Sequence, residues 1–310
     1  MCVRKALVRT DFAVVARRLC RVRDSAGDDD DPFPLDAAGF LAPLAIISAV
    51  DPTPGALVAP DVLAQAGALV LLGEPGLGKT TVFSELAATL EASDVEVLRV
   101  DGATLTHDSF EDLLGRHLAP QAHDGRGQAL LIVLDQADES PVIGKLARLI
   151  RQRLAQPPHR NVKFFVGCRT AEYPYALTDL LSEVSGSCVL ADLAPLTRQD
   201  AIELCDSIQG VAGETVVDGA IAAGAGALAS VPLTLNLLAR TFLRAGSLDE
   251  TPERLFALGV RELLDEPADD RDQPMLSTLE ERFAIAGRIA ARLFLSGRKS
   301  IWSGRALEAA

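Results

Sequence analysis

The stretch that most constrains the fold is the glycine-rich segment "LLGEPGLGKTT", residues 71–81, which directly follows a run of aliphatic residues. Glycine adopts backbone angles that are closed to other residues, so successive N–H groups in such a turn can point inward at one anion. The segment fits the pattern G-x-x-x-x-G-K-[ST]. Its fixed places are held by Gly73, Gly78, Lys79 and Thr80. We therefore predict a loop that holds a phosphate chain.

Each part of this loop has a predicted contact with a nucleoside triphosphate. A helix that begins near Lys79 places its positive N-terminal end at the phosphates, and the Lys79 ammonium adds a point charge for the β and γ phosphates. The Thr80 hydroxyl is a ligand for Mg²⁺. The predicted nucleotide-binding residues are Gly73, Glu74, Pro75, Gly76, Leu77, Gly78, Lys79, Thr80 and Thr81. The alternative is a tight glycine-rich turn without a ligand.

The sequence on both sides of the loop supports phosphate binding. Residues 68–72 read as a short buried strand, and residues 81–90 read as a helix with Val82, Leu86 and Leu90 on one face. A phosphate-binding loop needs this strand before it and this helix after it, whereas a simple turn needs neither.

Downstream of the loop, predicted strands alternate with predicted helices, which favours a parallel sheet flanked by helices. Further strands are expected at 95–102, 128–135, 162–168 and 187–190, and helices at 109–118 and 142–154. Together with residues 68–72 they predict an α/β P-loop NTPase core with a five-stranded, mostly parallel sheet of the ASCE type. We place this domain at residues 36–192.

From about residue 193 the strand signal ends and helical periodicity takes over. Helices are expected within 196–208, 216–230, 232–243 and 252–266, the Ala/Gly-rich part forming a tightly packed helix. Thr251-Pro252 is a helix-start signal, and Ser277-Thr278-Leu279-Glu280 reads as a capping box for another apolar helix. We predict a helical domain at 193–270 and the start of a further domain at 271–310.

Composition and charge narrow the classes of function. A hydrophobic content of 48% with 24% charged residues predicts a soluble globular protein, and a net charge of −13 disfavours nucleic-acid binding by this chain alone. The longest apolar candidate for a membrane span, residues 38–50, is interrupted by Pro43, so we expect no membrane contact. Five scattered cysteines without a C-x-x-C pair indicate free thiols and a cytoplasmic location.

The N-terminal segment is strongly basic. Residues 4–23 carry seven Lys and Arg against one acid, Asp11, which superficially resembles a transit peptide. We prefer an amphipathic surface helix, which explains the same residues. Its apolar face would consist of Val8, Phe12, Val15 and Leu19. The acidic run at 28–34 reads as a solvated linker, with a metal site as the alternative, so residues 1–35 form a basic helix and an acidic linker.

Acidic residues follow the predicted strand 128–135. Asp135 ends this strand, at the position of a carboxylate that holds Mg²⁺ through its water shell. Glu139 is the first candidate, and Asp138 the second, for the group that orients or deprotonates the attacking water. The alternative is that both residues only cap a helix that begins at 140–141.

Arg169 follows the predicted strand 162–168, at the sheet edge where the phosphate-binding loop is also expected. There its guanidinium can contact the γ-phosphate and report whether that group is present. A plain ion pair with Asp138 or Glu139 is the competing interpretation.

Five segments in series now carry a family resemblance: "LLGEPGLGKTT", "LLIVLDQADE", "KFFVGCRTAEY", "LAPLTRQDAIEL" and "ASVPLTLNLLA". They resemble the STAND class of signalling NTPases, in particular the NACHT group and its bacterial relatives in antiphage defence, over about residues 57–264. The D-x-x-D-E arrangement and the proline of "VPL" are the specific parts. The resemblance implies that Pro232 packs beside the adenine of ATP or ADP, whereas the local sequence also allows a helix-start proline.

The same resemblance implies a switch. ADP would hold a closed monomer, and exchange for ATP, after an unknown sensor ligand is detected, would open it to self-oligomerise. Only the beginning of the family's winged-helix domain is visible, at 271–310, so we expect a fragment or a naturally short relative. The histidine that such domains point at the nucleotide cannot be assigned, because all four histidines lie far upstream.

Other classes of function compete with the switch. The main alternative is an AAA+-like ATPase motor or loader that acts on nucleic acid or protein. A nonenzymatic scaffold is disfavoured, because a scaffold needs no water-activating acid such as Glu139. A small-molecule kinase is weaker still, since no acceptor-binding lid can be identified in the sequence.

Overall fold

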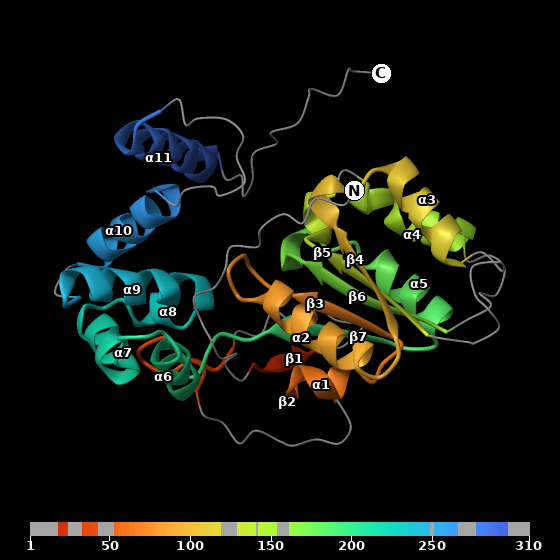
Figure 1. Cartoon of the computed structure of the whole chain (residues 1–310), viewed down its shortest axis with the longest axis horizontal. Helices are drawn as coiled ribbons and strands as arrows, with labels where there is room; N and C mark the ends of the chain where they lie inside the picture. Colours follow the sequence, from red (N-terminus) through yellow and green to blue (C-terminus); the bar gives the residue numbers. More distant parts are fainter. Residues whose placement is uncertain are drawn as a thin grey trace.

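The computed structural model describes residues 18–23, 33–42, 53–118, 129–140, 142–153, 161–248, 251–265 and 277–296. An α/β part built on one central sheet is followed by a helical part that lies at one end of it (Figure 1).

The sheet of the α/β part has seven strands. Their spatial order is β2 (Leu57–Val58), β1 (Cys20–Val22), β7 (Cys188–Leu193), β3 (Ala68–Leu72), β6 (Val162–Cys168), β5 (Leu130–Asp135) and β4 (Glu96–Asp101). The five strands from β7 to β4 are parallel, and β1 pairs antiparallel with β7 and β2. The prediction of an α/β P-loop NTPase fold with a mostly parallel sheet is confirmed.

The expected number of five strands is wrong, because β1 and β2 were missed. The expected surface helix is wrong for the described residues 18–23, where β1 lies. Cys20 and Val22 point into the core and Arg21 between them is partly exposed, which is the alternation of a strand. Residues 1–17 and 24–32, including the acidic run at 28–32, lie outside the described residues.

An acidic residue on the neighbouring strand explains why β1 tolerates its arginines. Asp192 of β7 pairs with Arg23 at 2.6 Å and with Arg21 at 3.5 Å. Two of the basic residues that suggested a helix surface, Arg21 and Arg23, therefore belong to ion pairs with a strand of the sheet.

Helices cover both faces of the sheet. On one face, α1 (Pro60–Leu63) and α2 (Lys79–Glu91) pack on alternate strand residues such as Leu69 and Leu71. On the other, α3 (His107–Leu118), α4 (Ile143–Arg153) and α5 (Ala176–Ser185) pack on the intervening ones, such as Val70. The sheet is thus buried on both faces, as its continuous apolar strands require.

Three one-turn 3₁₀ helices follow the carboxyl ends of neighbouring parallel strands. They are η1 (Gly102–Thr104) after β4, η3 (Ala137–Glu139) after β5 and η4 (Thr170–Glu172) after β6. Because parallel strands end at one edge of the sheet, the residues of these turns gather beside the glycine-rich loop.

The second half is helical, as predicted. Its helices are α6 (Arg198–Asp206), α7 (Gly213–Ala222), α8 (Gly226–Ala229), α9 (Pro232–Ala245), α10 (Pro252–Asp265) and α11 (Leu279–Ser296). Helices α6 to α10 contribute to a separate apolar core. The expectation of one continuous Ala/Gly-rich helix is wrong, because Gly224 adopts φ +72° and separates α7 from α8.

The capping box of α11 lies one residue later than expected. The Thr278 N–H donates to the Glu281 carboxylate at 2.8 Å, and the Glu281 N–H donates to the Thr278 hydroxyl at 3.3 Å. Glu280 instead pairs with Arg261 of α10. Residues 297–310 lie outside the described residues, so the winged-helix domain stays a prediction.

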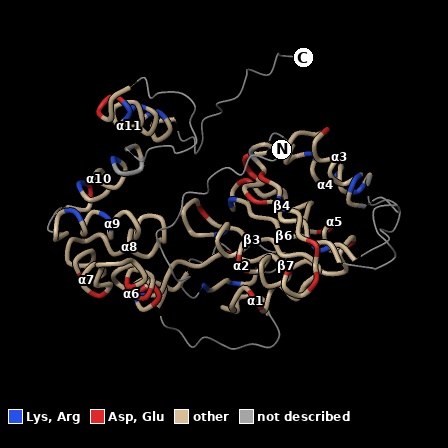
Figure 2. Tube along the Cα trace, in the orientation of Figure 1, with Lys and Arg blue, Asp and Glu red and all other residues tan. Residues whose placement is uncertain are grey.

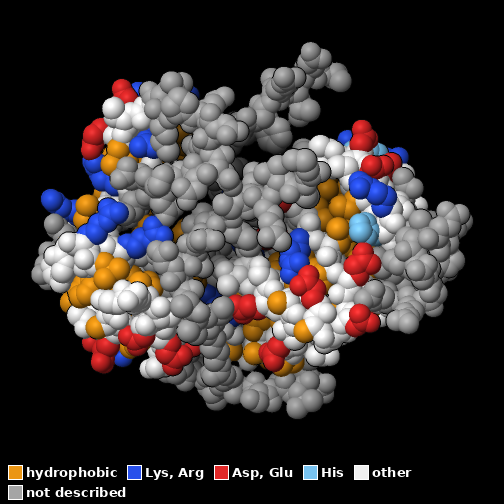
Figure 3. Space-filling view, in the orientation of Figure 1, with side chains coloured by type: hydrophobic (Ala, Val, Ile, Leu, Met, Phe, Trp, Pro, Cys, Tyr) orange, Lys and Arg blue, Asp and Glu red, His pale blue; other side chains and the backbone are white. Residues whose placement is uncertain are grey.

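Charged residues of both signs are interspersed along the described chain (Figure 2). The face shown in Figure 3 carries acidic and basic groups with apolar side chains between them. None of the described helices is both long and apolar enough to cross a membrane.

Candidate nucleotide-binding site

The glycine-rich loop joins β3 to α2 at the carboxyl edge of the parallel strands. Gly76 and Gly78 have φ of +84° and +93°, in the left-handed region that glycine enters without strain. Gly78 is the N-cap of α2 and has no side chain that could satisfy the first N–H groups of the helix. Those N–H groups are therefore available to an anion.

Lys79 folds back over the loop. Its ammonium donates to the carbonyl oxygens of Gly73 at 2.5 Å and Glu74 at 3.2 Å. Burial lowers the pKa of Lys79, and the charges of Asp138 and Asp135 oppose that shift. The cation thus lies between the loop and the acidic residues that follow β5.

Thr80 and Asp135, the two residues predicted to hold Mg²⁺, are in direct contact. The Thr80 hydroxyl donates to Asp135 Oδ2 at 2.5 Å, although 55 residues separate them in the chain. A hydroxyl and a carboxylate are the hard oxygen donors that Mg²⁺ prefers, and this ion usually takes its other ligands from phosphates and water. These residues therefore fit the metal. The described residues contain no cluster of three or more His, Cys, Asp or Glu side chains suited to a metal.

Asp138, Glu139 and Arg169 form a connected ion-pair group at the same edge. Arg169 Nε lies 2.9 Å from Asp138 Oδ2, and Arg169 Nη2 lies 3.5 Å from Glu139 Oε1. The backbone N–H of Arg169 donates to the other Asp138 oxygen at 3.1 Å. The ion-pair interpretation of Arg169 is the one that this arrangement shows.

The two candidate acids differ in exposure. The Asp138 side chain is 6% exposed and the Glu139 side chain 42% exposed. Both lie in η3, and α4 begins only at Ile143, after a break from η3. Asp138 is committed to Arg169 on both oxygens, so Glu139 is the acid that solvent can reach.

Pro232 is the first residue of α9, as its helix-start interpretation requires, and it also lies beside the loop. Its Cγ is 3.9 Å from the position that a Cβ on Gly78 would occupy. The next residue, Leu233, donates its N–H to the Gly76 carbonyl at 3.2 Å. The start of α9 is therefore in contact with the phosphate-binding loop.

Sequence reasoning missed one residue of this region, Arg18. Its side chain is buried next to the loop, and its Nη1 lies 3.8 Å from the Cβ position of Gly78. The arginine is one of seven basic residues in 4–23, and only the antiparallel pairing of β1 with β7 brings it here. Nothing local in the sequence distinguishes it from its neighbours.

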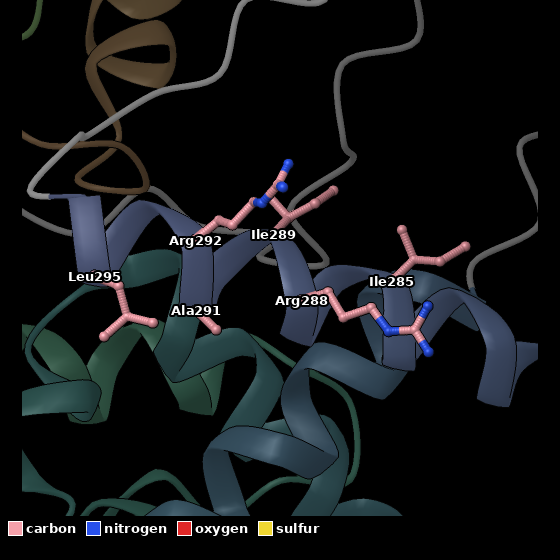
Figure 4. A pocket seen from close by; sticks show the side chains of 6 residues that line it. All are labelled: Ile285, Arg288, Ile289, Ala291, Arg292 and Leu295. Atoms are coloured by element: carbon pink, nitrogen blue, oxygen red, sulfur yellow. The ribbon is translucent and has the colours of Figure 1, made fainter.

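A separate hollow of about 620 Å³ lies along α11, away from the loop (Figure 4). Its lining residues are Ile285, Arg288, Ile289, Ala291, Arg292 and Leu295. All belong to one helix, and Figure 4 shows that their side chains spread along it without converging on one point. We assign no ligand to this hollow.

No protein-family model matches the chain, and no curated protein matches its sequence. Several solved structures resemble it at low identity. A RuvB mutant from Thermotoga maritima is 18% identical with a TM-score of 0.36, over 66% of this chain and 65% of that one. Orc1 from Aeropyrum pernix, in complex with DNA, is 15% identical with a TM-score of 0.39, over 74% and 78%. The chain spans about two thirds of the RuvB chains that it matches.

NtrX from Brucella abortus is similar at the same level, 15% identical with a TM-score of 0.38, over 75% of this chain and 61% of that one. The assignment of class rests on the chain's own residues. A parallel sheet, a glycine-rich loop between β3 and α2, and the contact of Thr80 with Asp135 at the end of β5 define a P-loop NTPase domain.

Proposed function

We propose that this chain binds Mg-ATP at the loop of residues 73–81 and hydrolyses it slowly. The observation that carries the proposal is the 2.5 Å contact between Thr80 Oγ1 and Asp135 Oδ2. A loop hydroxyl and a strand-end carboxylate in contact support Mg²⁺ binding beside the β and γ phosphates. The metal, when bound, neutralises charge on the phosphates.

The remaining residues take their roles from their positions around the loop. The Lys79 ammonium exchanges its bonds to the Gly73 and Glu74 carbonyls for the β and γ phosphates. Glu139, exposed beside these groups, orients the attacking water. Arg169, which joins Glu139 to Asp138, contacts the γ-phosphate and reports its presence.

Slow turnover is what we expect of a switch, because a resting state has to hold its product. The ion pair between Glu139 Oε1 and Arg169 Nη2 at 3.5 Å is partly exposed and therefore weak, so it leaves the carboxylate able to reach a water molecule.

We further propose that hydrolysis serves a STAND-type, NACHT-like switch with an ADP-bound closed state and an ATP-bound open state that oligomerises. The contact from Leu233 to the Gly76 carbonyl supports this, because it lets the start of α9 respond to what the loop holds. Pro232, beside Gly78, packs on the adenine and selects ATP over GTP. By the same resemblance, the trigger is a sensor ligand and the setting is antiphage or stress defence.

The test is the nucleotide content and turnover of the purified chain. We would release the bound nucleotide, identify it by chromatography, and follow phosphate release for wild type and Glu139→Ala. Glu172→Ala is the matched control, since Glu172 is an exposed glutamate of the neighbouring turn η4. We expect bound ADP, turnover on the order of 10⁻³ s⁻¹ as in unassisted P-loop switches, and loss of turnover only in Glu139→Ala.

Two other results would change the proposal. An empty site with fast multiple turnover would contradict the switch and favour an AAA+-like motor or loader acting on nucleic acid or protein. Equal turnover in Glu139→Ala and wild type would remove Glu139 from the mechanism.

A further inference from the structure

Arg18 is a buried arginine with hydrogen-bond donors that have no partner. Its residue exposure is 8%, and Nη2 donates to the Ala194 carbonyl at 2.6 Å. Nε and Nη1 are buried and have no hydrogen-bond partner among the described residues. Leaving N–H donors of a charged group unpaired in the interior is unfavourable. The side chain is therefore built for an acceptor that the described part of the chain does not supply.

The topology of the sheet explains how Arg18 reaches the loop. Because β1 is antiparallel to β7, with Cys20 opposite Leu193, the residues before β1 lie at the carboxyl edge of the parallel strands. Leu19 is buried in a cluster with Ala194, and its carbonyl accepts the Ala194 N–H at 2.9 Å. These contacts fix the backbone, so the position of the Arg18 guanidinium is set by the fold.

One of the unpaired donors, Nη1, lies near the N-terminal end of α2. Arg18 Nη1 lies 3.8 Å from the Cβ position of Gly78, the N-cap of this thirteen-residue helix. The helix has no acidic residue in its first turn and no side-chain cap. A cation and an uncapped helix N-terminus thus lie close to each other, and both favour a negatively charged ligand.

The surrounding acids do not occupy these donors. The charges that act on Arg18 are Asp200 at the start of α6 and Glu85 of α2, together with the Cys20 thiol. Asp200 already accepts a hydrogen bond from the Thr197 hydroxyl at 2.5 Å. Burial lowers the pKa of Arg18 to about 10, so the guanidinium still carries its charge at neutral pH.

We propose that Arg18 binds the phosphate chain of the nucleotide, with Nε and Nη1 donating to phosphate oxygens. The inference rests on the proposed function, since it deepens the site of residues 73–81. A guanidinium matches phosphate oxygens as a two-donor fork, which favours a phosphate contact over a contact with the base. Because Nη2 of the same group holds Ala194, phosphate binding is linked to the connection from β7 to α6.

The experiment is isothermal titration of the full chain, after release of any bound nucleotide, with Mg-ADP and, separately, with inorganic tripolyphosphate. The variants are Arg18→Gln and Arg18→Lys, and the matched control is Arg99→Gln, an exposed arginine of β4 paired with Glu91. We expect Arg18→Gln to weaken both ligands by about 10- to 100-fold, the range for hydrogen bonds to charged groups. Arg18→Lys should recover part of this loss, and Arg99→Gln should bind like wild type.

A melting-temperature readout separates binding from a merely structural role. If Arg18 serves the nucleotide, the melting temperature of Arg18→Gln should rise less on addition of ADP than that of wild type, whether or not the loss of the Ala194 contact lowers its ligand-free value. A structural role would lower the ligand-free melting temperature but leave the ADP-induced gain unchanged, and that result would overturn the proposal. Should Arg18→Gln fail to fold, Arg18→Lys carries the same comparison with the charge retained.

The outcomes distinguish this inference from the proposed function. If Lys79→Ala loses ADP binding while Arg18→Gln and Arg18→Lys bind both ligands like wild type, the role of Arg18 is overturned and the site stands. If Arg18→Gln weakens ADP but not tripolyphosphate, the contact is with the adenosine part and the phosphate assignment is overturned. If wild type binds neither ligand, both proposals fail.

Discussion

Asp138 and Glu139 are adjacent carboxylates in very different surroundings. Asp138 is buried, with both oxygens bonded to Arg169, whereas Glu139 reaches solvent and meets Arg169 at only 3.5 Å. The contacts of Asp138 hold Arg169 in place, whereas the exposure of Glu139 leaves its carboxylate accessible to water. We therefore expect the two residues to affect different measurements.

Asp138→Ala should lower the free energy of unfolding by about 2 kcal/mol, less than the loss for a fully buried pair because Arg169 is partly exposed. Glu139→Ala should change it by less than about 0.5 kcal/mol, as for exposed ion pairs. Urea denaturation of both variants gives the comparison. Equal losses of stability in the two variants would contradict a structural role for Asp138 that Glu139 does not share.

Three buried thiols give a second residue-level prediction. Burial raises the pKa values of Cys20, Cys168 and Cys205 from 9.0 to about 12. Since the thiolate is the reactive form, these cysteines should resist a disulfide reagent at pH 8 until the chain unfolds. Mass spectrometry of the labelled native protein checks this, and modification of Cys168 before unfolding would contradict it.

The same shifts fix a pH dependence. Between pH 9 and about 12 the unfolded chain releases thiol protons that the native chain retains. The unfolded state then binds fewer protons, so these three groups make stability fall as pH rises through this window. Denaturation midpoints of wild type and Cys205→Ala across the window should converge as pH rises.

A site residue could be predicted from the sequence when the pattern that marks it lies within a few consecutive residues. The loop motif and the strand end at Asp135 are both visible in a few consecutive residues. The sequence allows two interpretations of Arg169, a γ-phosphate contact or an ion pair. Its partners lie about 30 residues away, and they meet it only because β5 and β6 end at the same edge of the sheet. Arg18 was invisible as a site residue, since its neighbour Ala194 is 176 residues away.

At the level of elements, β1 joins the edge strand β2 to β7, and the residue before β1 packs at the same end of the sheet. Leu19 is 3% exposed and packs in a cluster with Leu41 and Ala194. Leu19→Ala should therefore cost about 3 kcal/mol of unfolding free energy, as large-to-small changes in cores do. Leu35→Ala, at 49% exposed, is the matched control and should change it by less than about 0.5 kcal/mol. Similar small losses in both variants would contradict the buried position of Leu19.

The parallel strands were predicted and the antiparallel ones were not, for a physical reason. β3, β5 and β6 are buried on both faces and read as continuous apolar runs bounded by loops. β1 has three residues and β2 has two, too few to show a period. Both strands are stabilised by pairing with segments that are distant in the sequence, and a local sequence pattern does not reveal such pairing.

At the level of the whole molecule, Gly76 lies at a contact between the two parts. A Cβ on Gly76 would lie 2.9 Å from the Leu233 Cβ, and Gly76 also has φ +84°. Gly76→Ala should weaken ADP binding and lower the melting temperature, because the loop and the start of α9 must separate. Gly246→Ala is the matched control, with φ +78° and open space around it.

The control should show only the cost of the backbone conformation, about 1 to 2 kcal/mol, with unchanged ADP affinity. Calorimetric titration and thermal melts of both variants provide the comparison. Equal ADP affinities in the two variants would show that the contact between Gly76 and Leu233 does not influence the site.

The order of the two parts along the chain was readable from the change of period near residue 193. The way the two parts pack against each other could not be predicted from the sequence. It depends on close contacts such as that of Leu233 with Gly76, and a periodic pattern gives no information on them. The proline of "VPL" was noticed only through a family resemblance, and its local sequence fits a helix start equally well.

The most direct test is calorimetric titration of the chain with Mg-ATP, after release of any bound nucleotide, for wild type, Lys79→Ala and Lys145→Ala. Lys145 is an exposed lysine of α4 and serves as the matched control. We predict Mg²⁺-dependent binding in wild type and Lys145→Ala, and a loss of about 100-fold or more in Lys79→Ala, where a partly buried charge contact is removed. Binding of ATP to Lys79→Ala as tightly as to wild type would contradict the assignment of residues 73–81 as the nucleotide site.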